Sequence, residues 1–124
     1  MKTYRIAILG ATGAVGQEMI RVLQERDFPV EALIPLASAR SAGIHVTFRG
    51  KKIPVREACE AAFAGVDIVL GAAGNDTALA LSPAIVKAGA VFIDNSSAFR
   101  IIRRRRAEGQ RLEEEKQAWE GYLN

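Results

Sequence analysis

The stretch "LGATGAVGQEM", residues 9–19, decides the fold of this 124-residue chain, because it spaces Gly10, Gly13 and Gly16 at intervals of three. The run before it, "TYRIAIL" (3–9), is apolar and typical of a buried strand. The segment after it, 14–26, has the apolar spacing of an amphipathic helix. A glycine-rich loop between a strand and a helix predicts a dinucleotide-binding unit. The alternative is a purely structural turn that holds no ligand.

Each glycine has a separate expected role. Gly10 permits the tight turn, Gly13 leaves room for a phosphate beside the backbone, and Gly16 lets the helix pack close to the strand. The N–H groups of the first helical turn would then point at a pyrophosphate, assisted by the helix dipole. The spacing is G-x-x-G-x-x-G, whereas G-x-G-x-x-G is the more common form.

Apolar strands alternate with helices along the rest of the chain. We expect strands at 30–38, 66–74 and 90–97, helices at 56–65 and 75–89, and a hairpin at 43–55 that turns at 49–51. In the first helix, Val15, Met19, Val22 and Leu23 should share the buried face. This order predicts an α/β fold: a Rossmann-like, doubly wound, mostly parallel sheet with a small hairpin. The domain should span 1–100, followed by a charged helical tail over 101–124.

Composition excludes several classes of protein. No run of 18 apolar residues could span a membrane, and the N-terminus does not have the pattern of a signal peptide. One cysteine permits no internal disulfide, in agreement with a cytoplasmic protein. A net charge of +3 suits an anionic ligand but falls short of a nucleic-acid binder, so we expect neither a membrane nor a nucleic-acid partner.

The end of the second strand indicates which dinucleotide binds. An NAD site usually places Asp or Glu there for the ribose 2′-hydroxyl. This chain has "ASARSAG" (37–43), where Ser38, Arg40 and Ser41 offer two hydroxyls and a guanidinium without a carboxylate. That group suits a 2′-phosphate, so we predict NADP as the cofactor. The alternative is a polar loop with an ordinary surface arginine.

Four separate stretches carry a family resemblance: "GATGAVGQEM" (10–19), "PLASARSAG" (35–43), "VTFRGKKIPV" (46–55) and "AGAVFIDNSSAFR" (88–100). In this order they resemble the N-terminal NADP-binding domain of the aspartate-semialdehyde dehydrogenases, from about residue 4 to residue 100. The resemblance implies NADPH-dependent reductive dephosphorylation of L-aspartyl 4-phosphate to the semialdehyde. That reaction lies on the route to lysine, threonine, methionine and isoleucine.

The resemblance also assigns site residues. It implies a pyrophosphate cradle of Gly10, Thr12, Gly13, Ala14 and Val15, and a 2′-phosphate site of Ser38, Arg40 and Ser41. Ala73 and Gly74 would line the cofactor, and Asn95 would lie near the nicotinamide. Arg100 matches the arginine that binds the substrate phosphate, and it follows the carboxyl end of a predicted strand, where ligands bind in open α/β sheets. From the residues alone, Arg100 could equally be a plain surface arginine.

The resemblance stops at Ile101, before the region that supplies the family's nucleophilic cysteine and histidine base. The one cysteine, Cys59, falls in the predicted helix 56–65 and is expected to be a small core residue. The one histidine, His45, falls in the hairpin. We therefore expect no catalytic residue, no metal site and no complete catalysis by this chain alone. A short-chain reductase would need a Tyr-x-x-x-Lys pair, which neither Tyr4 nor Tyr122 provides.

Two readings of the chain therefore remain. One is the cofactor half of a dehydrogenase, from a truncated gene. The other is a non-catalytic NADP-binding or subunit-interaction module, as a homo-oligomer or with a partner subunit. The tail carries four arginines, 103–106, and a narrow apolar stripe of Leu112, Trp119 and Leu123. We expect it to be a solvated helix that docks on the domain through Trp119, or a frayed end; the alternative is that its arginines contact RNA, a membrane or a partner.

Overall fold

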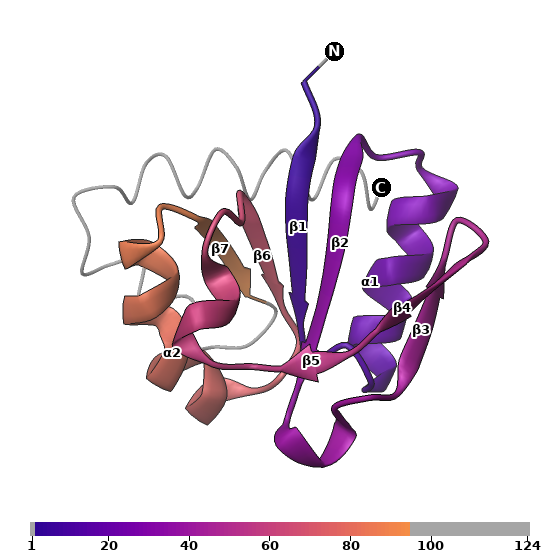
Figure 1. Cartoon of the computed structure of the whole chain (residues 1–124). Coiled ribbons are helices and arrows are strands. Elements are labelled where there is room, and N and C mark those ends of the chain that lie inside the picture. Colours follow the sequence, from indigo (N-terminus) through magenta and orange to yellow (C-terminus); the bar gives the residue numbers. More distant parts are fainter. Residues whose placement is uncertain (1, 95–124) are drawn as a thin grey trace.

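The computed structural model describes residues 2–94 (Figure 1). The helices and strands, with η marking short 3₁₀ helices, run in the order β1 (Tyr4–Leu9), α1 (Ala14–Glu25), β2 (Val30–Ala37), η1 (Ala39–Ser41), β3 (His45–Phe48), β4 (Lys51–Pro54), β5 (Arg56–Glu57), η2 (Glu60–Phe63), β6 (Ile68–Gly71), α2 (Asn75–Lys87) and β7 (Val91–Asp94).

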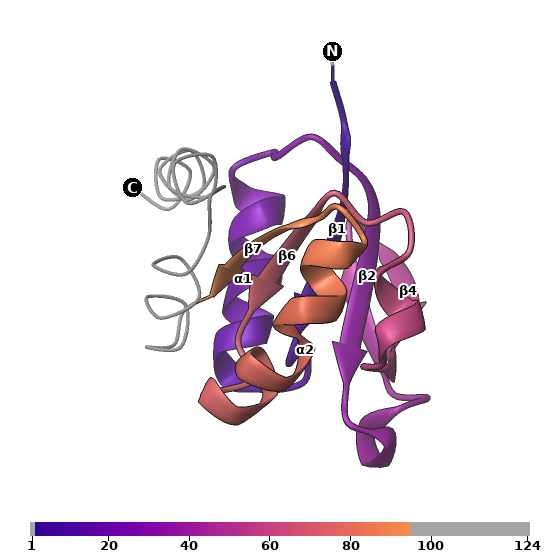
Figure 2. The ribbon, with the colours of Figure 1, turned by 90° about the vertical axis from the view of Figure 1, so that its left-hand side faces the viewer.

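The main sheet has five parallel strands in the order β5-β2-β1-β6-β7, with β1 at its centre. Successive side chains of β1 point to opposite faces, so its two faces build two cores. Ile6 and Ile8 belong to the core on the side of α1, which we call the α1-side core. Ala7 and Leu9 belong to the core that contains residues of η2 and α2, the α2-side core. Helices thus cover both faces, and the predicted doubly wound fold is confirmed (Figure 2).

Helix α1 buries three of the four residues expected on its inner face. Met19, Val22 and Leu23 are buried, but Val15 is 43% exposed, so its predicted place in the core is wrong. Side chains of a helix tilt toward its N-terminus. Val15 lies in the first turn of α1, where this tilt carries a side chain toward the helix end.

The predicted helix 56–65 is wrong. Arg56 and Glu57 instead form strand β5, which pairs in parallel with Leu36 and Ala37 of β2. The Ala58 N–H then donates to the Ala37 carbonyl at 2.7 Å, and only η2 is helical. Pairing with β2 satisfies backbone groups that a helix would have satisfied locally, so tertiary contact overrides local helix propensity. As a result Cys59 is exposed, and its predicted burial is also wrong.

The predicted hairpin is confirmed as β3 and β4, which pair antiparallel from His45–Pro54 to Phe48–Lys51. Its turn residues, Arg49 and Gly50, have φ of 51° and 79°, the conformation that tight hairpins favour. Phe48 is buried in the α1-side core. The Arg49 N–H donates to Gln24 Oε1 at 2.5 Å, and the Arg49 guanidinium donates to the Phe28 carbonyl at 2.5 Å. These bonds fix the hairpin tip beside the C-terminal end of α1.

The last predicted strand, 90–97, is described up to Asp94 as β7. Asn95, Arg100 and the tail 101–124 lie outside the described residues. Among residues 2–94, no helix has the length and apolar character needed to cross a membrane.

Candidate functional site

The order of the strands places a crevice at the carboxyl ends of β1 and β6. From β1 the chain moves outward through β2 to β5, and it then returns to β6 on the other side of β1. In open α/β sheets ligands bind at such a reversal of strand order. Three loops meet this edge of the sheet: 10–13 after β1, 38–41 after β2 and 72–74 after β6.

Two of the three glycines in the loop are required by the fold itself. Gly10 has a φ of +93°, and a Cβ there would lie 2.8 Å from the Ala72 carbonyl carbon. A Cβ on Gly16 would lie 2.2 Å from the Gly10 carbonyl oxygen. Both distances are shorter than real Cβ contacts, so Gly10 brings the loops after β1 and β6 together and Gly16 seats α1 on the first loop.

Gly13 has no such internal reason to be glycine. Its φ of −79° suits any residue, and the nearest atom to an added Cβ is 3.6 Å away, an ordinary contact. Gly13 is exposed at the N-cap of α1, where no side chain caps the helix. The first N–H groups of a helix have no acceptor within the helix, and they carry the positive end of its dipole. The loop therefore offers N–H donors to an anion and space for it to approach.

The remaining loop residues frame this N-terminus. Thr12 is half-buried, and its carbonyl accepts a hydrogen bond from Gln17 Nε2 at 2.9 Å, which ties the loop to α1. Ala14 and Val15 are exposed in the first turn. The structure therefore brings all five residues predicted for the pyrophosphate cradle together around one helix end.

The loop after β2 presents the residues predicted for the 2′-phosphate. Ser38 and Arg40 are exposed and Ser41 is half-buried, around the single turn of η1. The Ser41 N–H donates to the Ser38 carbonyl at 2.9 Å, which closes that turn. Arg40 makes no ion pair with any other residue in the described part of the chain, so its guanidinium remains available to an anion.

The loop after β6 carries Ala73 and Gly74, both exposed. Gly74 has a φ of +100° and forms the N-cap of α2. Gly71, the last residue of β6, is not among the residues that the sequence predicts for the site. A Cβ there would lie 2.4 Å from Oδ1 of the buried Asp94 on the neighbouring strand β7. The glycine therefore makes space for a buried carboxyl group, and the pairing of β6 with β7 that reveals it is tertiary.

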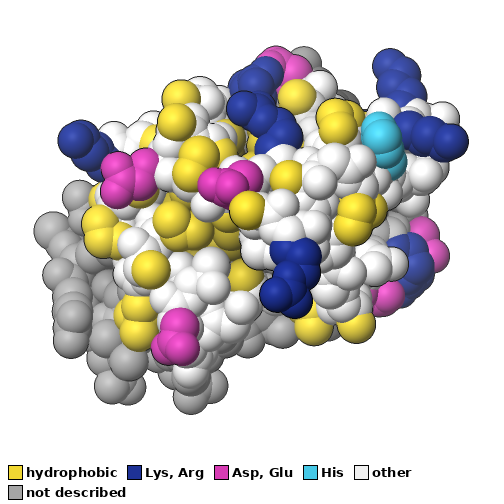
Figure 3. All heavy atoms as spheres, turned by 60° about the horizontal axis from the view of Figure 1, so that its bottom comes forward, with side chains coloured by type: hydrophobic (Ala, Val, Ile, Leu, Met, Phe, Trp, Pro, Cys, Tyr) yellow, Lys and Arg dark blue, Asp and Glu magenta, His cyan; other side chains and the backbone are white. Residues whose placement is uncertain are grey.

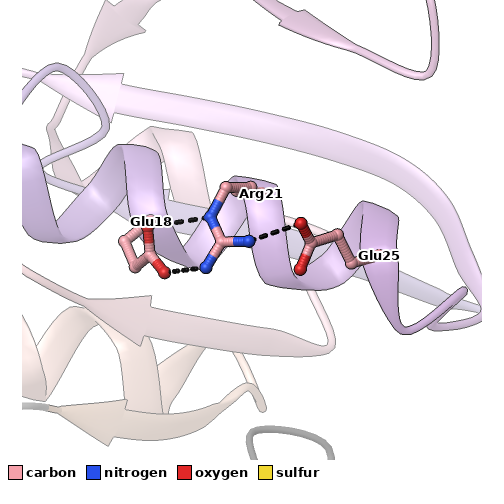
Figure 4. A network of polar contacts seen from close by, with 3 residues as sticks. All are labelled: Glu18, Arg21 and Glu25. Carbon is pink, nitrogen blue, oxygen red and sulfur yellow. Dashed lines mark hydrogen bonds and ion pairs between the residues drawn. The ribbon is translucent and has the colours of Figure 1, made fainter.

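A groove of about 480 Å³ opens beside the glycine loop, between α1 and the hairpin, and its walls are Thr12, Gln17, Ile20, Arg21, Gln24, Ile44, His45, Val46 and Thr47. Only Thr12 is shared with the predicted cradle, and neither Gly13 nor Arg40 lines it. Arg21 in its wall donates to Glu18 from Nε at 3.0 Å and pairs with Glu25 at 2.5 Å (Figure 4). This arginine already has two carboxylate partners, so the groove is a weaker anion site than the helix N-terminus.

The two side chains with potential for nucleophilic chemistry are not brought together. His45 begins β3, in the hairpin that packs on the α1-side core, whereas Cys59 precedes η2, which packs in the α2-side core. Within residues 2–94, no three His, Cys, Asp or Glu side chains are grouped to hold a metal ion.

Comparisons with known proteins agree with this geometry, in which the loops at the carboxyl ends of the strands are suited to hold a nucleotide. The sequence model of "Semialdehyde dehydrogenase, NAD binding domain" matches residues 5–108. The chain belongs to this family. The family and the fold expected from the sequence are therefore both confirmed, and the domain is one that binds NAD(P).

Related proteins extend the comparison. An aspartate-semialdehyde dehydrogenase of Bacillus subtilis is 50% identical over 96 residues, which is 77% of this chain and 28% of the relative. Its counterpart in Synechocystis is 51% identical over 98 residues, or 79% of this chain and 29% of the relative. The chain thus spans less than a third of the length of these relatives and matches only their cofactor-binding domain.

Solved structures agree with this match. Aspartate semialdehyde dehydrogenase II of Vibrio cholerae, crystallised with ASA, superposes with a TM-score of 0.77 at 45% identity, covering 80% of this chain and 32% of that one. The enzyme of Candida albicans, crystallised with NADP, gives a TM-score of 0.64 at 26% identity, covering 80% and 31% respectively.

Proposed function

We propose that this domain binds NADP(H) in preference to NAD(H), with the pyrophosphate at the N-terminus of α1. The proposal rests on Gly13. Its φ of −79° does not require glycine. An added Cβ would lie 3.6 Å from its nearest neighbour, so packing does not require glycine either. A ligand that must approach the backbone supplies the missing reason. Gly10, Thr12, Ala14 and Val15 would complete the cradle.

Arg40 would select the phosphorylated cofactor. It is exposed, without an acidic partner among the described residues, and Ser38 and Ser41 lie on the same turn. A planar guanidinium and two hydroxyls suit a 2′-phosphate, and no carboxylate in 37–43 would repel it. The NADP of the Candida structure supports this choice. Ala73, Gly74 and Asn95 would line the remainder of the cofactor.

We further propose that the domain serves the reaction for which its relatives are named. There it would hold the nicotinamide cofactor, which supplies the hydride for reductive dephosphorylation of L-aspartyl 4-phosphate, and Arg100 would bind the substrate phosphate. The chain's own described residues would bind and orient the cofactor. The nucleophile and base that the resemblance implies would come from outside this domain.

The cofactor site is tested by calorimetric titration of the 124-residue protein with NADPH. Saturable binding is expected, and Gly13→Val should abolish it, because the added side chain fills the phosphate's space while leaving the backbone conformation allowed. The melting curve of Gly13→Val without ligand serves as the folding control. A folded protein that binds no NADPH up to millimolar concentration would refute the proposal.

Cofactor choice is tested by repeating the titration with NADH. A charge-assisted contact contributes roughly 1.5–3 kcal/mol, so NADPH should bind about 10-fold to 100-fold more tightly. Arg40→Ala should remove most of that preference and leave NADH affinity nearly unchanged. Arg5→Ala, a matched arginine next to the amino edge of the sheet, should leave the preference intact. Equal affinities in the unmutated protein would rule out the assignment of Arg40.

A further inference from the structure

The hairpin leaves one edge of strand β3 without a partner strand. Among residues 2–94, β3 pairs with β4 alone, and Figure 1 shows it alongside α1. The tight turn at 49–50 makes its closing pair, Phe48 and Lys51, a hydrogen-bonded pair, and such pairs then alternate along the strands. The N–H and C=O groups of His45 and Thr47 therefore point away from β4. Within the described residues, no hydrogen bond to these groups is found.

Two observations at the other end of the hairpin agree with this register. Pro54 lies directly opposite His45, and a proline, which has no N–H, suits a position where that group would point away from the ladder. The Val55 N–H donates to the Ile44 carbonyl at 2.7 Å, and the Gly43 N–H donates to the Val55 carbonyl at 2.9 Å, so the next bonded position is where the alternation expects it. Together they fix which main-chain groups of β3 face outward.

The groove of about 480 Å³ between α1 and the hairpin runs along this free edge. Four consecutive residues, 44–47, line it. Successive side chains of a strand point to opposite faces, so a run of four indicates that the groove meets the strand at its edge. The opposite wall is one face of α1, with Gln17, Ile20, Arg21 and Gln24. Helix and strand edge thus flank a space in which a further strand could lie.

The polar side chains of the helix wall already have partners. Gln17 Nε2 donates to the Thr12 carbonyl at 2.9 Å, and Gln24 Oε1 accepts from the Arg49 N–H at 2.5 Å. Arg21 is held by its two carboxylate partners. These bonds fix the helix wall in the absence of a ligand. The main-chain groups on the edge of β3 therefore remain available to a ligand.

The inner side of the groove is apolar. Ile20 is buried, Val46 is half-buried and Ile44 is 52% exposed. Val46 shares its face of the hairpin with Phe48, which belongs to the α1-side core. A strand added beside β3 would direct every second side chain toward this face. Those side chains are expected to be apolar, and they would cover the exposed surface of Ile44.

The outer face of the hairpin has the opposite character. His45 and Thr47 lie on it, and Lys52 is directly across from Thr47. The segment 38–56 contains five Arg and Lys residues and neither Asp nor Glu. Figure 3 shows the one histidine side chain, in cyan, exposed with Lys and Arg side chains, in dark blue, beside it. This charge favours acidic side chains at the outward positions of an added strand.

We propose that the free edge of β3 binds an extended acidic segment of a partner protein, which adds a third strand to the hairpin in the groove beside α1. Main-chain hydrogen bonds to His45 and Thr47 supply affinity, and alternating apolar and acidic side chains supply specificity. The contact is small, so a dissociation constant on the order of 10 µM to 1 mM is expected. The groove shares only Thr12 with the proposed cofactor cradle, so this proposal does not depend on cofactor binding.

Amide hydrogen exchange, followed by NMR on the isotope-labelled 124-residue protein, tests the strand edge directly. The probe is a seven-residue peptide of alternating valine and glutamate with both ends capped. At about 90% occupancy, exchange of the His45 and Thr47 amides should slow by about 10-fold, because only the free protein exchanges. The Val46 and Phe48 amides, which already bond to β4, are internal controls and should change less.

Two substitutions of Thr47 separate main-chain from side-chain contact. Thr47→Pro removes the outward N–H and leaves the ladder to β4 intact, as Pro54 does on the other strand. Peptide affinity should fall by at least about 5-fold, because a carbonyl of the peptide loses its donor. Thr47→Val keeps the N–H and removes only the hydroxyl, so it should bind within about 2-fold of the unmutated protein. Melting curves must show that both variants are folded.

A second peptide tests the charge of the partner. A capped peptide of alternating valine and lysine should bind at least about 3-fold more weakly at low salt, and the difference should shrink as salt is added. Saturating NADPH should not displace the acidic peptide, since the two ligands would lie on different sides of the glycine loop.

Each contrary result overturns the proposal. It fails if the peptide leaves the His45 and Thr47 amides unprotected, if Thr47→Pro binds as well as Thr47→Val, or if the lysine peptide binds as tightly as the acidic one. Displacement by NADPH would place the peptide at the nucleotide-binding edge instead. Protection of the same amides that grows with protein concentration, without peptide, would mean that a second copy covers the edge and would also refute it.

Discussion

At the scale of single residues, the glycines of the first loop differ in whether the packing of the domain requires them. Gly16 is required by packing, since a Cβ there would lie 2.2 Å from the Gly10 carbonyl oxygen, which belongs to the backbone and cannot move aside. Gly13 is required by nothing inside the domain. Within this one motif, Gly16 therefore serves the packing of the fold, whereas Gly13 is the position that we propose for ligand binding.

Alanine substitutions make this division measurable. Gly16→Ala should destabilise the fold by about 1–3 kcal/mol or more, because α1 must move off the loop to admit the methyl group. Gly13→Ala should change stability by only a few tenths of a kcal/mol up to about 1 kcal/mol, the difference between glycine and alanine at an N-cap. Urea unfolding of the ligand-free proteins gives both values. Equal destabilisation by the two variants would contradict the packing argument.

At the scale of elements, the exposed face of α1 is organised by Arg21 between Glu18 and Glu25 (Figure 4). Hydrogen bonding to Arg21 lowers the pKa of Glu18, and the same two carboxylates raise the pKa of Arg21. All three side chains are about half exposed, so water and salt weaken the network. It contributes to the helix rather than to the site.

The pH dependence of this network follows from the direction of the Glu18 shift. A carboxyl group whose pKa is lower in the folded state stabilises that state above its ordinary pKa, and the stabilisation disappears as pH falls through the lowered value. Arg21→Met should therefore reduce the melting temperature slightly at pH 7 and low salt, and the difference should vanish at acid pH or in high salt. Arg56→Met, at an exposed arginine without an ion pair among the described residues, is the control. A difference that persists in acid would show that Arg21 acts through packing instead.

At the scale of the whole molecule, the sheet separates the only cysteine from the only histidine. The hairpin of His45 packs with α1, and the 3₁₀ turn after Cys59 packs with α2. A thiolate mechanism needs its base within hydrogen-bond reach of the sulfur. The described fold provides no such pair.

The 124-residue protein alone should consequently catalyse no phosphate-dependent reduction of NADP by aspartate semialdehyde. Absorbance at the NADPH band, with NADPH binding verified on the same preparation, provides the measurement. Turnover above background that is lost in Cys59→Ser would contradict this expectation. It would also require a role for the exposed turn around Cys59 in catalysis.

The local sequence by itself determined the features of this protein that depend on neighbouring residues. The alternation of apolar strands and amphipathic helices, the turn at Arg49–Gly50 and the glycine loop all follow from short-range periodicity and backbone freedom. The doubly wound fold and its nucleotide-binding edge could therefore be predicted from the sequence.

Only the tertiary structure decided the features that depend on residues distant in the sequence. Pairing with β2 turned Arg56 and Glu57 into a strand and exposed Cys59, because hydrogen bonds between strands outweighed the local helix preference. Packing against Ala72 and Asp94 likewise explained Gly10 and Gly71, since burial depends on what the rest of the chain brings near.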